Sequence, residues 1–568
     1  MEKLWRIKNN ELSETVTKLQ TELSVDKFVA SLLVQRSITT YEQAKSFFRP
    51  SLTALHNPFL MKDMDLAVTR LNLAIQNNER ILIYGDYDVD GTTSVALVFS
   101  FLRELHNNID YYIPDRYLEG YGISFKGIDY AKQTNCTLII ALDCGIKAID
   151  KVNYANDLQI DFIICDHHTA GNEIPKAIAV LDPKRPDCSY PFKELSGCGV
   201  GFKLLQAFSI QNNIVPEKLY NFIDLVAVSI ASDIVSVSGE NRILAYHGIE
   251  KLNTNPLTGL KAMMKLTKID DKKIEISDSV FILGPRINAA GRIKSARAAV
   301  ELLITNNLND AEEFSKEIDA HNSTRKNLDK SITQEALEQI QLTEQNNPKK
   351  ATIVYNPAWH KGVVGIVASR LIESFYRPTV VLTKSGDKLA GSARSVDGFN
   401  LYNAVEACSH LLEGFGGHMY AAGLNMKEEK LSEFKKCFEN YVAATITPEQ
   451  QIPKIDIDLQ LNFSAITPKF YRIMKQFAPF GPDNNMPVFC TRNVTDTGNS
   501  RIVGQTMEHL KLELMDEDGF VFSGIAFSMA GFYPDIASGK KFDICFTIDE
   551  NQFRGNVTLQ LLIKDIKI

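Results

Sequence analysis

The sequence predicts a multidomain α/β protein. A doubly wound parallel-sheet domain leads, through a long connecting helix, to a second, smaller α/β domain and a C-terminal OB-like β-barrel. Three observations predict this fold. Apolar runs of strand length alternate with helical stretches between residues 81 and 182, a polar stretch without Gly or Pro covers residues 310–342, and short alternating runs follow residue 452. At roughly 100–200 residues per domain, a chain of 568 residues holds about three to five domains.

Residues 1–55 are expected to form an N-terminal helical segment. The stretches SVDKFVASLLVQR and TYEQAKSFF place apolar residues at helical spacing. No residue type in this segment points to a particular chemistry.

Residues 56–255 are expected to form the first α/β domain. Five short apolar runs alternate there with helices or long loops, a pattern typical of a mostly parallel sheet that is buried on both faces. The five runs are ILIYG (81–85), IDYYIP (109–114), TLIIALD (137–143), DFIICD (161–166) and AIAVLD (177–182).

Three further regions complete the chain. Residues 256–345 are expected to be helical. Within 310–342, residues at a spacing of three or four form one stripe of mixed apolar and polar side chains, and as one helix this segment would span about 50 Å. Such a mixed stripe is more typical of a connector between domains than of a core helix. Residues 346–448 repeat the α/β pattern, and residues 449–568 contain short strands separated by turn residues, which favours a small barrel such as an OB-fold.

Composition excludes several classes of protein. A net charge of −7 and a pI of about 5.9 argue against a general nucleic-acid coat, although a metal-loaded cleft with a few Arg residues can still bind phosphates. No apolar window of about 18 residues predicts a membrane span, and no apolar run behind the N-terminal charges predicts a secretory signal. The 9 Cys include no CxxC pair, which indicates a reduced cytosol and argues against a disulfide frame or a zinc ribbon.

The densest motif is the heptapeptide GDYDVDG, directly after the predicted strand ILIY. Its three carboxylates, Asp86, Asp88 and Asp90, stand at alternating positions, which is costly unless a cation lies among them. A solvated acidic loop is the simplest alternative. A calcium EF-hand loop is a second, but its twelfth position would be Leu97 instead of Glu, and a strand flanks the motif.

Further acids and imidazoles follow other predicted elements. Asp143 ends one strand, Asp166-His167-His168 ends the next, and Asp233 follows AVSIAS. Ligands of open α/β sheets bind beyond the carboxyl ends of the strands, so these side chains should converge. Each alone would usually be a helix cap or turn residue. Together they favour Mn²⁺ or Mg²⁺ over zinc, and two such cations about 3.5–4 Å apart could activate water and hold a phosphoryl group.

The order DYDVDG, Asp-Cys-Gly, DHH and Ser-Asp resembles the DHH phosphoesterase superfamily. Within it, seven further motifs are similar to the RecJ family of single-stranded-DNA-specific exonucleases, and the resemblance spans residues 60–490, with a weaker match in the tail. The seven are PDRYLEGYG (114–122), LSGCGVGFKL (195–204), GPRINAAGR (284–292), WHKGVVGIVASR (359–370), GSARS (391–395), GFGGHMYAAG (414–423) and FAPFGPDNN (477–485).

The resemblance implies metal-dependent hydrolysis of single-stranded DNA from the 5′ end to 5′-mononucleotides, with Mn²⁺ or Mg²⁺ as cofactors. It implies one cation held by Asp90, Asp143, His167 and Asp233. A second cation would share Asp143 and also be held by Asp88 and Asp86.

The same resemblance assigns the catalytic roles. His168 would face the scissile phosphate as a charge stabiliser or proton donor, beside Asp143 and His167, and Asp166 would orient a neighbouring imidazole. The sequence departs from the family pattern at one place. Related phosphatases have a His four residues before the middle Asp, where this chain has Tyr84, so water or Asp86 must complete the ligand set.

Several Gly, Arg, Ser and His residues are candidate substrate contacts. The family places a pocket for the terminal 5′-phosphate here, and guanidinium groups hold phosphate oxygens at two points. A surface ion pair is the alternative for any one Arg. The candidates are Arg116, then Arg286, Asn288 and Arg292 in a loop rich in Gly and Pro, then Gly391, Ser392 and Arg394, and finally Gly417 and His418, expected at a helix start. Tyr121 and His360 could contact a base or simply pack in a core.

Two other functions stay open at this point. A DHH phosphodiesterase for short oligonucleotides or cyclic dinucleotides would typically lack the β-rich tail of residues 452–568. A non-catalytic replication scaffold would have lost metal ligands, all of which are present here. The resemblance further implies single-stranded DNA, a RecQ-type helicase and single-strand-binding protein as partners, no membrane, a cytoplasmic location and roles in DNA recombination and repair. We also expect a cleft too narrow for duplex DNA.

Overall fold

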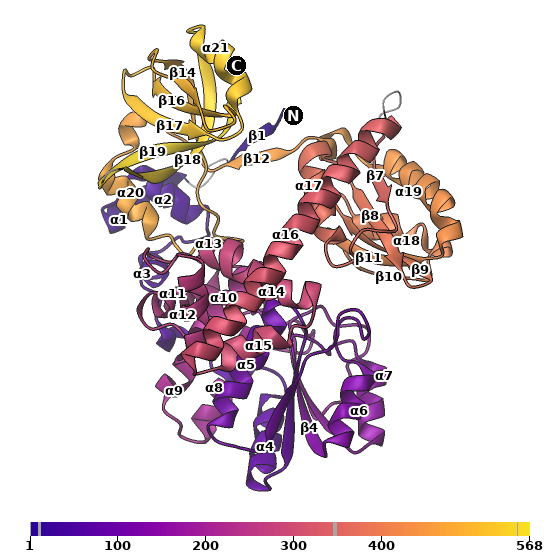
Figure 1. Cartoon of the computed structure of the whole chain (residues 1–568). Helices are drawn as coiled ribbons and strands as arrows, with labels where there is room; N and C mark the ends of the chain where they lie inside the picture. The colour runs from indigo at the N-terminus through magenta and orange to yellow at the C-terminus, as the bar shows by residue number, and fades with distance from the viewer. Residues whose placement is uncertain (1, 9–12, 345–348, 554) are drawn as a thin grey trace.

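The computed structural model describes residues 2–8, 13–344, 349–553 and 555–568. A first α/β domain, a long diagonal helix, a second α/β domain and a β-barrel follow one another along the chain (Figure 1). This arrangement confirms the predicted fold class. No helix in the described ranges is both long enough and apolar enough to cross a membrane.

The first domain is built on a five-stranded parallel sheet in the order β3-β2-β4-β5-β6. Each of the five predicted strands is present. Their bounds are β2 Arg80–Gly85, β3 Ile109–Tyr112, β4 Cys136–Leu142, β5 Asp161–Cys165 and β6 Ala179–Leu181.

Successive residues of these strands enter different cores, because side chains alternate between the two faces of a sheet. Ile81 and Ile83 pack in one cluster with α4 (Met64–Gln76), α5 (Val89–Arg103) and α8 (Gly197–Gln211). On the opposite face, Leu82 and Tyr84 pack with α6 (Phe125–Gln133) and α7 (Ile149–Asp157). Helices therefore cover both faces, and the carboxyl ends of the strands stay free to hold side chains.

Several helices follow before the connector: α10 (Ile223–Asp233), α11 (Gly239–Thr254), α12 (Thr258–Leu266), α14 (Gly284–Ile293) and α15 (Arg297–Ile304). The prediction of a loop over residues 284–292 was wrong, since α14 continues a π-helical turn, η3 (Ser279–Leu283). Its Pro lies just after the π-helical turn, and Ile287 and Ala290 are buried at helical spacing.

Helix α16 (Leu308–Glu344) confirms the predicted connector. Its 37 residues correspond to a length of about 55 Å. It packs against α14 at one end and against α17 (Val364–Phe375) further along. The expected domain boundary at residues 345/346 lies outside the described residues.

The second α/β domain has a mixed five-stranded sheet in the order β10-β11-β9-β8-β7. Its elements are β7 Thr352–Tyr355, β8 Thr379–Ser385, β9 Lys388–Arg394, β10 Gly414–His418, β11 Ala421–Met426, α18 Leu401–Glu406 and α19 Leu431–Thr445. Gly417 and His418 lie in edge strand β10, so their expected place at a helix start was wrong. The Gly-rich segment instead pairs with β11, with Gly416 opposite Gly423.

The C-terminal strands close into a barrel, because β14 pairs with both β18 and β16 at the ends of the series β14-β18-β19-β17-β16. The strands are β14 Phe489–Asp496, β16 His509–Met515, β17 Val521–Ala526, β18 Phe542–Phe553 and β19 Asn556–Lys567. Phe463, Phe489 and Phe546 lie in its core. The predicted OB-like barrel is therefore confirmed.

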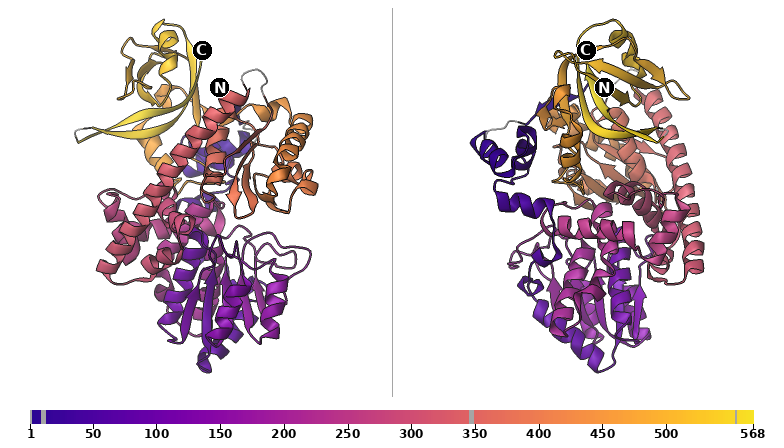
Figure 2. Two further views of the ribbon diagram at one scale, coloured as in Figure 1. Left: turned by 45° about the vertical axis from the view of Figure 1, so that its right-hand side comes forward. Right: turned by 90° about the vertical axis from the view of Figure 1, so that its left-hand side faces the viewer.

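The N-terminal helices α1 (Ser13–Leu23) and α2 (Lys27–Val34) pack on the barrel side of the molecule, and α3 (Tyr41–Phe48) lies against α11 of the first domain, where Arg242 contacts Phe47 (Figure 2). Strand β1 (Leu4–Ile7), which was not predicted, pairs in parallel with β12 (Lys454–Ile457). A strand whose partner lies some 450 residues away has no local sequence signal.

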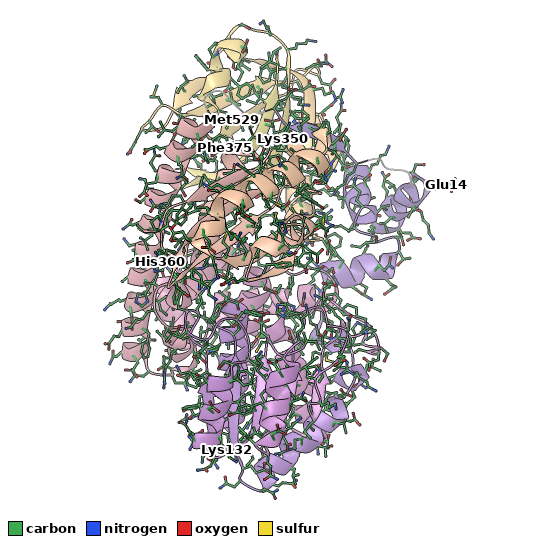
Figure 3. All side chains as sticks on the ribbon, turned by 90° about the vertical axis from the view of Figure 1, so that its right-hand side faces the viewer. Glu14, Lys132, Lys350, His360, Phe375 and Met529 are labelled. Atoms are coloured by element: carbon green, nitrogen blue, oxygen red, sulfur yellow. The ribbon has the colours of Figure 1, made fainter. Side chains whose placement is uncertain are left out.

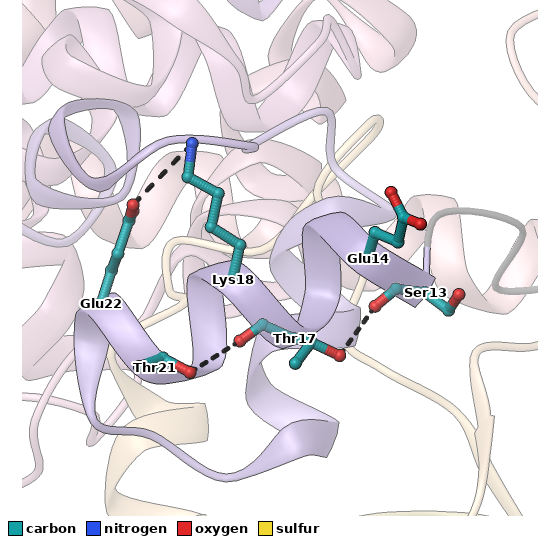
Figure 4. Close-up of a pocket in the computed structure, with 6 residues that line it drawn as sticks. All are labelled: Ser13, Glu14, Thr17, Lys18, Thr21 and Glu22. Atoms are coloured by element: carbon teal, nitrogen blue, oxygen red, sulfur yellow. Dashed lines mark hydrogen bonds and ion pairs between the residues drawn. The ribbon is translucent and has the colours of Figure 1, made fainter.

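A shallow hollow runs along the outer side of α1 (Figure 4). Thr17 and Thr21 donate hydrogen bonds to carbonyls one turn earlier, and Lys18 lies 3.9 Å from Glu22. These polar groups bind other groups of the same helix, so the hollow does not form a catalytic or binding site.

Candidate functional site

Acidic side chains converge where three strands of the first sheet end. Asp86 follows β2, Asp143 follows β4 and Asp166 follows β5, while Asp88 and Asp90 begin α5. Their convergence results from the parallel sheet, whose carboxyl ends share one edge.

The imidazole of His167 lies at the centre of the first predicted ligand set. Its Nε2 is 3.2 Å from Asp143 Oδ1, 3.5 Å from Asp233 Oδ2 and 3.6 Å from Asp90 Oδ2. Helix α10 brings Asp233 to this point, because it is the last residue of that helix. The structure therefore places together all four side chains that the resemblance assigned to one cation.

Hydrogen-bond donors of the protein fix the carboxylate of Asp90. Its oxygens accept hydrogen bonds from the backbone N–H groups of Gly197 (2.6 Å) and Cys198 (2.8 Å) at the start of α8, and from Ser229 Oγ (2.7 Å). The N-terminus of a helix favours an anion, so α8 is a suitable place to hold this carboxylate.

Asp86 and Asp88 lie beside this group. Asp86 Oδ1 accepts from Gly122 N at 3.1 Å, and Asp88 caps α5 through Gly91 N at 3.0 Å. Asp86 Oδ2 and Asp143 Oδ1 are buried and have no hydrogen-bond partner among the described residues. Buried carboxylate oxygens left in this way fit a site for a hard divalent cation.

The electrostatics support the same interpretation. Burial, followed by repulsion from neighbouring carboxylates, raises the pKa values of Asp86, Asp88 and Asp143, and it raises the pKa of Asp233 to about 8. Such a cluster is stable as anions only when positive charge lies among them. The donor set of carboxylates and one imidazole fits Mn²⁺ or Mg²⁺.

Asp166 orients His168, as the resemblance implied. Its Oδ1 lies 2.7 Å from His168 Nδ1, and its Oδ2 accepts from Ile146 N at 2.9 Å. Burial lowers the pKa of His168, but the carboxylates of Asp166, Asp233 and Asp90 outweigh it and raise this pKa to about 9.

A second group of charged side chains, four arginines, carries the positive charge of the site. Burial, and then the charges of Arg116, Arg325 and Arg394, lower the pKa of Arg292 to about 10. None of these four forms an ion pair with a carboxylate within the described ranges. The neighbouring Asp329, whose carboxylate lies near Arg325, is bound by Arg370 at 2.8 Å. Guanidinium groups that repel one another without acidic partners fit an anionic ligand.

Each guanidinium is instead held by neutral groups. Arg394 Nη1 donates to Ser392 Oγ at 2.9 Å, and Arg292 Nη1 donates to the Gly362 carbonyl at 3.0 Å. The Arg116 guanidinium lies 4.7 Å from the centre of the Tyr87 ring, within the acidic motif. These contacts orient the groups without neutralising their charge.

Some predicted substrate contacts lie elsewhere or face another way. Arg286 forms an ion pair with Asp319 of α16 at 2.8 Å. A side chain at Gly391 would collide with Leu382, so this residue faces the core of its sheet. Asn288 lies one turn before Arg292 with its buried Oδ1 unpartnered in the described part of the chain. His418 occupies the same cross-strand row as Arg394, two strands away.

Arg325 and Tyr117 enter the site without having been predicted there. Arg325 stands on α16, where its spacing indicated only a connector stripe. The Tyr117 hydroxyl donates to the Arg292 carbonyl, and the Tyr117 ring lies edge-on to His360 at 6.1 Å, where the two α/β domains meet (Figure 3). Tyr121, for which a base contact or core packing was predicted, directs its hydroxyl at the Asp143 carbonyl and His168 Nε2.

The Tyr84 side chain is not available as a cation ligand. It is fully buried, and its hydroxyl donates to the Gly122 carbonyl at 3.0 Å. Burial also raises the pKa of Tyr84, which disfavours the phenolate that a cation would require.

Comparison with known families gives three matches along the chain. Residues 80–230 match the DHH family, N-terminal domain, residues 348–444 match the DHHA1 domain, and residues 457–565 match the RecJ OB domain.

Individual proteins are similar over most of the chain. The single-stranded-DNA-specific exonuclease RecJ of Bacillus subtilis (strain 168) is 36% identical over 99% of this chain and 71% of its own length. RecJ in complex with Mn²⁺ from Thermus thermophilus has a TM-score of 0.85 at 24% identity, covering 100% of this chain and 79% of that chain. A structure of exonuclease RecJ bound to manganese has a TM-score of 0.61 at 29% identity, covering 70% of this chain and 98% of that chain.

Proposed function

Because this chain belongs to the RecJ family of single-stranded-DNA-specific exonucleases, we propose that it removes 5′-mononucleotides from single-stranded DNA in the 5′ to 3′ direction. It is a metal-dependent nuclease of the DHH type. One observation supports the finer assignment above all others. The buried acids and imidazoles at the sheet edge face a group of guanidiniums that have no acidic partner within ion-pair distance in the described ranges.

The acidic side would hold Mn²⁺ or Mg²⁺. Asp90, Asp143, His167 and Asp233 would bind one cation, and Asp86 and Asp88 would bind a second that shares Asp143. When bound, such cations polarise phosphoryl oxygens and lower the pKa of water. The contacts of Asp90 with α8 keep its carboxylate in place for this purpose.

The arginine side would hold the terminal 5′-phosphate. Arg116, Arg292 and Arg394, with Ser392, offer several N–H and O–H donors to a dianion. Arg325 adds positive charge from α16. If this phosphate is fixed here while the next one lies at the acids, one nucleotide separates the two anchors. That spacing accounts for both the polarity and the mononucleotide product.

His168 would complete the reaction. Asp166 fixes its Nδ1, so Nε2–H is presented to the 3′ oxygen of the terminal nucleotide, which leaves the phosphorus of the next nucleotide. The proton neutralises the charge that develops on this oxygen as its bond to phosphorus breaks.

The direct test compares 5′- and 3′-end-labelled single strands with a matching duplex, in Mn²⁺, in Mg²⁺ and with chelator. We expect mononucleotides to appear only from the 5′ end of the single strand, and only with a cation. Release from the 3′ end, or activity in chelator, would contradict the proposal. Cleavage restricted to dinucleotides would favour a short-oligonucleotide phosphodiesterase instead.

The setting of the reaction is proposed from the family resemblance. We infer a cytoplasmic enzyme of DNA recombination and repair that meets single strands produced by a RecQ-type helicase and coated by single-strand-binding protein. Co-purification of the tagged chain with both proteins, lost after nuclease digestion of the DNA, would indicate that DNA alone brings them together.

A further inference from the structure

Tyr121 joins two functional residues through one oxygen atom. Its hydroxyl donates to the Asp143 carbonyl at 3.2 Å and lies 3.1 Å from His168 Nε2. The residue stands between Gly120 and Gly122, whose φ angles of 87° and 78° are ones that favour glycine. The loop therefore bends sharply enough to direct the phenol into the site.

The directions of these hydrogen bonds follow from the proton-donor role proposed for His168. In that role His168 carries Nε2–H, so the phenol oxygen accepts from it and the single phenol O–H is directed at the Asp143 carbonyl, which can only accept. His168 Nδ1 lies 2.7 Å from Asp166 Oδ1. Both ring nitrogens of His168 are thus held, and the imidazole has one orientation.

The ring of Tyr121 is held separately from its hydroxyl. It lies edge-on to Tyr87 at 6.3 Å and edge-on to His168 at 5.8 Å. These ring contacts do not depend on the oxygen. A phenylalanine in this place keeps them and loses only the two hydrogen bonds.

We propose that Tyr121 is a positioning residue that acts through His168. The phenol oxygen of Tyr121 holds His168 Nε2–H at the place where the leaving 3′ oxygen takes the proton. When the substrate binds, the 3′ oxygen replaces the phenol oxygen as the partner of Nε2–H. The proposal rests on the proton-donor role given to His168 in the proposed function. In the step itself, water adds to phosphorus and loses one proton to solvent, and the bond from phosphorus to the 3′ oxygen breaks. This oxygen keeps the electron pair and takes the His168 proton, which His168 then regains from solvent.

The test is Tyr121→Phe on two single strands that differ in one atom. One has the normal 3′ oxygen in its first linkage, and the other has sulfur there, which leaves as a thiolate and needs no proton. We expect kcat to fall about 10-fold for the oxygen substrate, the size usual for a lost orienting contact, with KM changed less than about 2-fold. For the sulfur substrate kcat should stay within about 2-fold of the wild type. Equal losses on both substrates, or no loss on either, would overturn the proposal.

Two further variants separate the possible failures. Tyr112→Phe removes a hydrogen bond to Glu119 of the same loop without touching His168, and it should match the wild type on both substrates. His168→Ala should be far more defective on the oxygen substrate than on the sulfur one. If His168→Ala shows this difference and Tyr121→Phe does not, only the role of Tyr121 fails. If His168→Ala loses activity equally on both, the proton-donor role itself fails.

Discussion

The acidic side and the arginine side of the site are assembled in different ways. The acids and His167 come from one domain, at the ends of neighbouring strands or on helices packed against them, and backbone N–H groups fix Asp90 and Asp86. The guanidiniums come from a loop, from α14, from α16 and from β9. Cation binding should therefore depend on a single folded domain, whereas phosphate binding should depend on how the domains are placed.

The largest effect is expected on the acidic side. Asp143→Asn removes the carboxylate that both cations would share, so activity should fall at least about 1000-fold. Binding of single-stranded DNA should be largely kept, because the guanidiniums do not contact Asp143. Turnover and fluorescence anisotropy on the same preparation check this. A variant with full activity would remove Asp143 from the metal site.

The arginine side should give the opposite pattern. Arg394→Ala should weaken binding of a 5′-phosphorylated strand by about 10- to 100-fold, the loss of one charge-assisted contact, and leave a 5′-hydroxyl strand nearly unaffected. The slope of the logarithm of the binding constant against the logarithm of the salt concentration should become less negative by about 0.7. Lys326→Ala removes an exposed cation from α16 and serves as the control. An unchanged preference for the phosphorylated end would exclude Arg394 from the pocket.

A third prediction concerns a buried acid at the same sheet edge that is not in the ligand set. Burial raises the pKa of Asp182, at the end of β6, to about 7, and its Oδ2 has no described partner. Since this value lies above that of the unfolded chain, the folded state binds the proton more tightly, and the free energy of unfolding decreases as pH rises from about 4 to 7.

Asp182→Asn removes this titration. The free energy of unfolding of the variant minus that of the wild type should rise by on the order of 2 kcal/mol from about pH 5 to pH 8, because only the wild type loses stability from this titration over this range. Urea unfolding in chelator at the two pH values measures the gain. A difference between the two proteins that does not change with pH would mean that Asp182 does not titrate in this range.

The smallest effect is expected at Tyr84. Tyr84→Phe loses the hydrogen bond to the Gly122 carbonyl, which should cost about 1 kcal/mol of stability. The concentration of Mn²⁺ that gives half-maximal activity should not change, because this hydroxyl is directed away from the acids. A marked shift in that concentration would bring Tyr84 back into the ligand set.

The same comparison shows what the sequence could predict. The convergence of Asp86, Asp143 and Asp166 was predictable, because each follows a recognisable strand and parallel strands end at a common edge. The secondary structure around Arg292 and His418 was not. Glycine and proline there indicated a loop and a helix start, whereas burial of Ile287 favours a helix and pairing with β11 favours a strand.

Side-chain direction was the other limit. The sequence around Gly391 does not show that this residue faces the core, and the sequence around Arg286 does not show its ion pair with Asp319. Both depend on a neighbouring element. Arg325 was missed for the same reason, because a stripe on a connecting helix does not reveal what packs beside it. The Tyr121 hydroxyl depends on a loop bent at two glycines.

Anomalous diffraction from crystals soaked in manganese would show where cations bind in this protein. We expect two peaks at the sheet edge, one among Asp90, Asp143, His167 and Asp233, and one among Asp86, Asp88 and Asp143. Crystals that showed no peak among these side chains, or peaks only at other places, would contradict this expectation.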